Sequence, residues 1–123
     1  MKRDMNLIRL LLLQHETGET PPEMAEYDEK LVLHNIALML DAKLIDGFAE
    51  PGPDGQIHFA IVNRLTWAGH DFLDSARDLS IWKKATDSII KPGLSWSFSI
   101  LAEFLKAEAR RRLGSALGMP PPP

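Results

Sequence analysis

The sequence predicts an α+β fold in which helices accompany a single β-hairpin. Three observations support this fold class. Residues 4–16 and 29–42 carry apolar side chains at helical spacing. Two short apolar runs, at about residues 44–50 and 56–65, flank the turn sequence Pro51-Gly-Pro-Asp-Gly55. A helical pattern then returns after Thr66. With 123 residues and 45% hydrophobic content, the chain suits one domain with a modest core.

The first predicted helix covers residues 4–16. Asp4 can accept a hydrogen bond from an early backbone N–H group, and its charge suits the start of a helix. The apolar stripe of this helix is wide enough to predict burial on more than one side. Residues 17–22 form a turn or loop, and residues 23–26 are predicted as a short strand.

The second predicted helix begins after Asp28, its expected N-cap, and leads into the hairpin. At the far end of the hairpin, Thr66 is expected to cap a helix over residues 67–78. Gly69 has no Cβ and would let that helix approach the sheet closely. Three apolar residues of the same helix are predicted to lie beneath the hairpin: Phe72, Leu73 and Ala76.

Two further helices complete the prediction. Ser80 is expected to start a short helix that ends near residues 91–93, and Ser95 or Ser97 to start a final helix that runs to about Leu113. The predicted domain is therefore 1–113, with a core over 1–78 and C-terminal helices over 79–113, followed by a flexible Pro-rich tail over 114–123. A helix followed by a hairpin and another helix is the order of a winged helix-turn-helix-like domain.

Several stretches together resemble the family catalogued as domain of unknown function 2513. The most specific pair is Met1-Lys-Arg-Asp-Met-Asn-Leu-Ile-Arg9 with Arg64-Leu-Thr-Trp-Ala-Gly-His-Asp-Phe-Leu-Asp74, and shorter matches include Leu44-Ile-Asp-Gly47 and Gly93-Leu-Ser95. The resemblance covers residues 1 to about 110. It implies a winged-helix outline and an origin in bacteria, phages or prophages, and it carries over no activity or binding residue. Lys43 stands where the family often has glycine, which disfavours a left-handed helix cap there.

Charge and composition indicate the cellular compartment and limit the kinds of partner that the chain could bind. The net charge is −3, the pI is about 5.8 and there is no cysteine, which fits a reducing cytosol. The apolar run Leu7–Leu13 is interrupted by Arg9 and is too short for a membrane span or a signal peptide. We expect a cytoplasmic protein with no membrane partner. Any basic surface for nucleic acid must be local.

The leading hypothesis for the function is a DNA-binding or transcription-regulatory module, and the alternative is a protein-interaction module that engages a host factor without binding DNA. The second helix would be the reading helix, and the hairpin tip, with Glu50 and Asp54, would repel phosphate. The candidate nucleic-acid contacts are Lys30, His34, Asn35, Arg64 and the cluster Arg110, Arg111 and Arg112. For that cluster, a simpler interpretation is that its cations complement the dipole at the last turn of the final helix.

No catalytic, cofactor or metal site is predicted. The chain contains no nucleophile signature or phosphate loop, and His70 and Asp74 lack a third local ligand. We therefore expect a non-enzymatic module without an identified small-molecule substrate. The final helix carries more apolar surface than one small core needs, which favours a homodimer through Phe98, Leu101, Phe104 and Leu105. The three tryptophans are interpreted as core or interface anchors.

Overall fold

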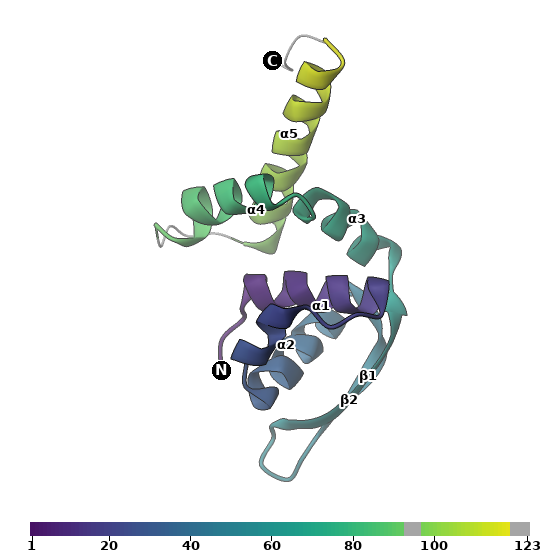
Figure 1. The fold of residues 1–123 in the computed structure, drawn as a ribbon. Coiled ribbons are helices and arrows are strands. Elements are labelled where there is room, and N and C mark those ends of the chain that lie inside the picture. Colours follow the sequence, from purple (N-terminus) through teal and green to yellow (C-terminus); the bar gives the residue numbers. More distant parts are fainter. Residues whose placement is uncertain (93–96, 119–123) are drawn as a thin grey trace. The chain divides into compact units, whose positions relative to one another are not determined.

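The structure is a computed structural model that describes residues 1–92 and 97–118 (Figure 1). It confirms the mixed α+β class, with five α-helices and one antiparallel hairpin in the described residues. The elements are α1 (Met5–Thr17), η1 (Pro22–Glu26), α2 (Glu29–Asp41), β1 (Ile45–Pro51), β2 (Ile57–Leu65), α3 (Trp67–Ala76), α4 (Leu79–Ala85), η2 (Thr86–Ile90) and α5 (Phe98–Ala116).

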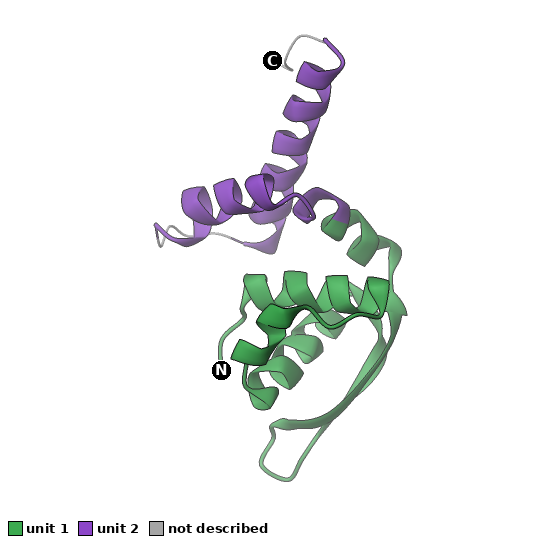
Figure 2. Cartoon of the chain, viewed as in Figure 1, with its two compact units in different colours: residues 1–73 green, residues 74–123 purple. Residues whose placement is uncertain are grey.

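The chain divides into two compact units (Figure 2). The first contains residues 1–73 and the second begins at residue 74, so the division falls inside α3. The sequence placed the end of the core at residue 78, a short distance beyond this point.

In the first unit, α1 contacts α2 and β2, and α2 contacts both strands. Asp4 caps α1 as predicted, because its carboxylate accepts a hydrogen bond from the Leu7 N–H at 3.1 Å. Most of the circumference of α1 is buried, including the side chain of Arg9, which confirms the prediction drawn from its wide apolar stripe.

The predicted short strand at residues 23–26 is wrong. Residues Pro22–Glu26 form a 3-10 helix, because Pro22 stands in its first turn and fixes a backbone angle that suits a helical turn. Asp28 occupies the N-cap position of α2, but its side chain makes no capping hydrogen bond.

The hairpin lies where the turn sequence predicted it. Ile45 pairs with Leu65 and Phe48 with Ile61, and the register shifts between Asp46 and Gly47. Gly47 has a φ of 157°, and a Cβ at this position would stand 1.9 Å from the carbonyl oxygen of Ile61. Only glycine fits this point of close strand approach.

In the second unit, α4 packs against α5. Asp78, and not Ser80, caps α4, since its carboxylate accepts from the N–H groups of Ser80 and Ile81. The helix continues into η2, a single π-helical turn. Ser97 caps α5, as one of the two predicted alternatives, while Ser95 lies outside the described residues.

The helix α5 reaches Ala116, so the predicted tail is wrong for residues 114–116, which are helical. Residues 119–123 of the predicted tail lie outside the described residues.

Candidate functional site

The C-terminal end of α2 is fixed by a Schellman motif, in which two hydrogen bonds close the last helical turn. The N–H of Leu44 donates to the carbonyl of Met39 at 2.9 Å, and the N–H of Lys43 donates to the carbonyl of Leu40 at 3.0 Å. Lys43 has a φ of 59°, so the chain adopts the left-handed cap that a lysine was expected to disfavour. Leu44 and Met39, the positions at which this motif usually has apolar side chains, are both buried.

The start of α3 is hydrogen-bonded to this end of α2 and to the base of the hairpin. The Thr66 hydroxyl donates to the carbonyl of Lys43 at 2.6 Å and accepts from the N–H of Gly69 at 3.1 Å, which confirms Thr66 as a cap. A Cβ on Gly69 would lie 2.0 Å from the carbonyl oxygen of Leu44, so the predicted close approach is confirmed. Phe72, Leu73 and Ala76 are buried, and their predicted position beneath the hairpin stays a prediction.

A groove of about 750 Å³ lies between α2 and β1 and ends at the first turn of α3. Helix α2 contributes Ala37, Leu40 and Asp41 to its lining. The rest of the lining comes from the hairpin and the start of α3: Lys43, Ile45, Asp46, Gly47, Phe48, Ala49, Ile57, Thr66, Trp67 and Ala68. Most of the residues that line it are apolar, polar atoms make up nearly half of its exposed lining, and its charged side chains are two carboxylates and one ammonium group.

Trp67 is the residue that the sequence interpretation missed. Its side chain is 88% exposed at the end of the groove, so it is not a core anchor in this chain. Trp82, by contrast, is buried as expected, and Trp96 lies outside the described residues. No local pattern distinguishes an exposed tryptophan at the first position of a helix from a buried one, because exposure here depends on the tertiary fold.

The hairpin presents an apolar face to solvent. Phe48 and Phe59 are each 49% exposed and Ile61 is 40% exposed. The rings of Phe48 and Phe59 lie 5.9 Å apart between centroids, at a tilt of 57°, which is a favourable aromatic contact. We call these three residues the hairpin patch. At the base of the hairpin, Arg64 pairs with the carboxylate of Asp46 at 2.6 Å.

Only some of the α2 residues that were predicted to contact DNA lie on the surface of the protein. Lys30 is exposed and His34 is partly exposed. Asn35 is fully buried, which overturns its assignment as a base-reading residue. Its amide accepts from the Asp4 N–H at 2.8 Å and donates to the carbonyls of Lys2 and Leu31. Asn35 therefore fixes residues 2–4 against α2.

The hairpin tip is acidic, as the sequence indicated. The carboxylate of Asp54 accepts from the Gln56 N–H and lies 3.0 Å from His58 Nε2. These contacts, the Gln56 hydrogen bond first, lower the pKa of Asp54, so the tip carries negative charge over most of the pH range.

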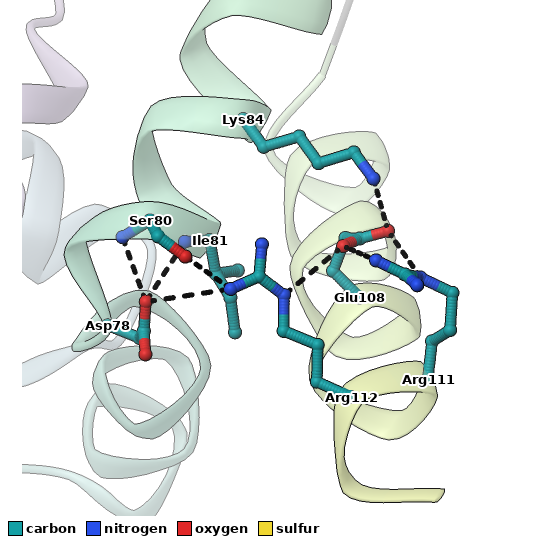
Figure 3. Close-up of polar contacts among 7 residues, drawn as sticks. All are labelled: Asp78, Ser80, Ile81, Lys84, Glu108, Arg111 and Arg112. Carbon is teal, nitrogen blue, oxygen red and sulfur yellow. Dashed lines mark hydrogen bonds and ion pairs between the residues drawn. The ribbon is translucent and has the colours of Figure 1, made fainter. Parts of the chain in front are cut away.

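The arginine cluster near the C-terminus is largely occupied by a carboxylate of its own helix (Figure 3). Glu108 is buried and accepts two hydrogen bonds from Arg111, at 2.9 and 3.1 Å, and one from Lys84 of α4 at 2.9 Å. Arg112 lies 3.6 Å from Glu108, 4.0 Å from Asp78, and donates to the Ser80 hydroxyl. We call this set the Glu108 network.

Because α5 continues to Ala116, the cluster does not lie in its last turn, and the dipole interpretation is wrong. Arg111 and Arg112 instead join α5 to α4 through the Glu108 network. Arg110 is exposed, and no ion pair involving it is found in the described part of the chain. Glu108 stands three and four residues before these arginines, a spacing that could have predicted the pairing.

Two of the four predicted dimer contacts are already covered by the chain itself. Leu101 and Leu105 have no exposed area, so they cannot form an interface with a second copy. This part of the prediction is wrong, because the two leucines belong to the core of the monomer. Phe98 and Phe104 are partly exposed.

The described residues contain neither a candidate metal site nor a helix that could span a membrane. Within residues 1–92 and 97–118, no three His, Cys, Asp or Glu side chains gather in a way that could hold a metal ion. His70 lies 3.9 Å from Glu16, and Asp74 pairs with Arg77. None of the helices in this part of the chain combines the length and apolarity that a membrane crossing requires.

These features define a class: a small α+β protein built around a helix-flanked hairpin, with an apolar groove and an apolar hairpin face open to solvent. The model of the family described as "Hypothetical protein (DUF2513)" matches residues 2–95, and the chain belongs to this family. A relative from Haemophilus influenzae, titled "Uncharacterized protein", is 27% identical over 109 residues, which are 84% of this chain and 91% of the relative. No solved structure matches the chain.

Proposed function

We propose that this chain is a non-enzymatic binding module with a winged-helix-like core, and that it binds another protein through its hairpin. The observation that carries the proposal is the hairpin patch, in which Phe48, Phe59 and Ile61 remain 40–49% exposed on one β-hairpin. Aromatic side chains are enriched in the cores of protein interfaces, where their large area is desolvated. An exposed apolar patch that includes an aromatic pair therefore suits a protein partner.

Electrostatics support a protein over nucleic acid as the partner of the hairpin. The tip beyond the hairpin patch is acidic, and the one arginine of the hairpin, Arg64, is paired with Asp46. Phosphate would meet negative charge at the tip and no unpaired arginine on either strand.

Variants that alter only the surface can test the proposal. A triple variant, Phe48→Ser, Phe59→Ser and Ile61→Ser, removes the hairpin patch. The matched control, Leu79→Ser with Leu117→Ser, removes two other exposed apolar side chains, which are 70% and 65% exposed. The tagged parent and both variants are incubated with a bacterial lysate, and the retained proteins are compared by mass spectrometry.

We expect at least one protein to be retained by the parent and the control and lost by the hairpin variant. Circular dichroism of each variant checks that the fold is kept. If every retained protein is held equally by all three chains, the hairpin patch is not the contact surface and the proposal fails.

DNA binding is the second candidate function, and one observation favours it. The hydrogen bonds of Asn35 hold residues 2–4 against α2, which places the backbone of Lys2 beside the helix that carries Lys30 and His34. A cationic surface at this end of α2 could contact phosphate even though Asn35 itself is buried.

A mobility-shift series against salt concentration tests this candidate. If α2 contacts DNA, Lys30→Ala with His34→Ala should lower the salt slope by roughly one unit for each phosphate contact that is lost. A lower slope only in the triple alanine variant of Arg110, Arg111 and Arg112 would place nucleic acid on α5. If the parent binds no DNA at low salt, where electrostatic contacts are strongest, the candidate is lost.

A further inference from the structure

The groove beside α2 follows the open edge of β1. Five consecutive residues of the strand, 45–49, line it. Alternate residues of a strand share one face of a sheet, so a groove lined by consecutive residues runs along the strand's edge. In the described residues β1 pairs with β2 alone.

The backbone of β1 carries hydrogen-bonding groups that face this groove. The carbonyl of Leu44 accepts from the Thr66 N–H, so the Leu44 backbone faces the β2 side of the hairpin. In an antiparallel ladder the next residue faces the opposite way and the pattern alternates. At the register shift between Asp46 and Gly47 the extra residue, Asn63, lies in β2, so the alternation along β1 continues past it. The N–H and C=O groups of Ile45, Gly47 and Ala49 therefore point toward the open edge. An open strand edge is a template for pairing with another chain.

The side chains around this edge suit an apolar, uncharged occupant. Ala37 and Leu40 of α2 form one wall, and Trp67 stands at the end with 88% of its side chain exposed. Asp41 and Lys43 bring opposite charges to the rim, and Asp46 is already paired with Arg64. The groove has little net charge, so it gives no electrostatic advantage to a charged ligand.

We propose that the edge of β1 binds an extended apolar segment of a partner protein as a third strand. The segment lies between β1 and α2, exchanges backbone hydrogen bonds with alternate residues of β1, and places one side chain against Trp67. Five strand residues span roughly 16 Å, which sets the length of the recognised segment at about five residues. This strand addition rests on the proposed function, because it specifies how a protein partner is held.

Peptides selected against the full chain provide the probe. A phage-displayed library of random ten-residue peptides is selected on the immobilised protein, and the strongest binder is synthesised with a fluorescent label. Affinity is measured by fluorescence anisotropy. Two further peptides carry backbone N-methyl groups at every second position, in the two alternative registers. N-methylation removes a backbone donor and leaves the side chains unchanged.

Strand addition predicts that one N-methylated register weakens binding at least about tenfold and the other changes it little, because only alternate peptide N–H groups face β1. Trp67→Ala should weaken binding by about tenfold or more, as for an interface tryptophan. Leu79→Ala is the control: it removes an exposed apolar side chain that neither lines the groove nor belongs to the hairpin patch, and it should leave the affinity unchanged. Phe59→Ala, which alters the hairpin patch and not the groove, is measured beside it.

Each other outcome overturns the proposal. If both N-methylated registers bind equally well or equally badly, the peptide is not held as a strand. If Phe59→Ala weakens binding and Trp67→Ala does not, the hairpin patch binds the peptide, so strand addition fails while the proposed protein-binding function stands. If no peptide is selected, edge recognition of short segments is rejected. The lysate comparison, repeated with Phe59→Ser and Ile61→Ser, which leaves the groove residue Phe48 in place, then judges the proposed function separately.

Discussion

Replacing Glu108 with glutamine should destabilise the packing of α5 on α4 without changing the size of the side chain. Glu108 is 11% exposed at its side chain and accepts from Arg111 and Lys84, while Arg112 lies 3.6 Å away. The hydrogen bonds from Arg111, and next those from Lys84, lower the pKa of Glu108 from 4.5 to about 2. Glutamine keeps the shape of the side chain and removes the charge that holds the three cations.

The pKa sets an upper limit to the effect. A carboxyl whose pKa falls from 4.5 to about 2 on folding stabilises the folded state by at most about 3 kcal/mol at neutral pH. The three cations are 38–50% exposed, and they, more than a deep core, cover the carboxylate, so solvent screens the interaction. We therefore expect Glu108→Gln to lower the free energy of unfolding by about 1–2 kcal/mol at pH 7.

The pH dependence of the free energy of unfolding distinguishes the contribution of the Glu108 charge from that of side-chain packing. Because the pKa of Glu108 is lowered in the folded state, the stabilisation is fully present above pH 4.5 and is lost as the pH falls toward 2. Urea unfolding followed by circular dichroism is measured at pH 7 and at pH 2.5 for the parent and Glu108→Gln. The difference between the two chains should be largest at pH 7 and should shrink at pH 2.5.

Glu103→Gln is the matched control, since Glu103 is exposed on the same helix and makes no ion pair with any described residue. It should change the free energy of unfolding by less than about 0.5 kcal/mol. Equal loss in the two variants, or the same loss for Glu108→Gln at both pH values, would refute the assignment of the stabilisation to the Glu108 charge.

Three further substitutions test the first unit by the same urea unfolding at pH 7. Lys43→Gly should stabilise the chain by about 0.5–1 kcal/mol, because it relieves a left-handed backbone in a residue with a Cβ; a loss would contradict this. Gly47→Ala should destabilise it by about 2–4 kcal/mol, since the new Cβ meets the Ile61 carbonyl. Asn35→Ala should cost about 1–3 kcal/mol, because the Asp4 N–H loses its acceptor, and exposed Asn63→Ala is its control.

Local signals predicted the elements whose determinants are close in sequence. The N-cap roles of Asp4 and Thr66 followed from residues three positions away, and the turn at residues 51–55 followed from its own composition. These caps and this turn are decided within about one turn of chain. The role of Gly69 was also predicted correctly, although the carbonyl that it approaches, that of Leu44, lies 25 positions earlier in the sequence.

Predictions failed where a distant contact decides the outcome. Asn35 looked like a base-reading residue on a helix surface, but its partner Asp4 is 31 positions earlier in the sequence. Lys43 looked unsuited to a left-handed cap, yet the Thr66 hydroxyl binds its carbonyl from 23 positions away. Together with the two Schellman bonds, that contact offsets a backbone penalty of about 1–2 kcal/mol. Sequence spacing does not report such partners.

Several residues of the block 64–74 stabilise the fold, whereas Trp67 does not. Leu65, Phe72 and Leu73 are buried, Thr66 caps α3, and Gly69 permits the close approach to Leu44. Trp67 stands among them with 88% of its side chain exposed, so its removal should cost the fold little.

An exposed indole at the end of an apolar groove raises the risk of aggregation and gives no packing energy in return. The first turn of α3 would form equally well with a polar residue, because Thr66 and Gly69 already fix its position. A tryptophan at this position therefore adds nothing to the stability of the fold, whereas the proposed strand addition uses it as a contact for the partner segment. The same physical reasoning that assigns the rest of the block to structure thus makes Trp67 the first residue at which to test that proposal.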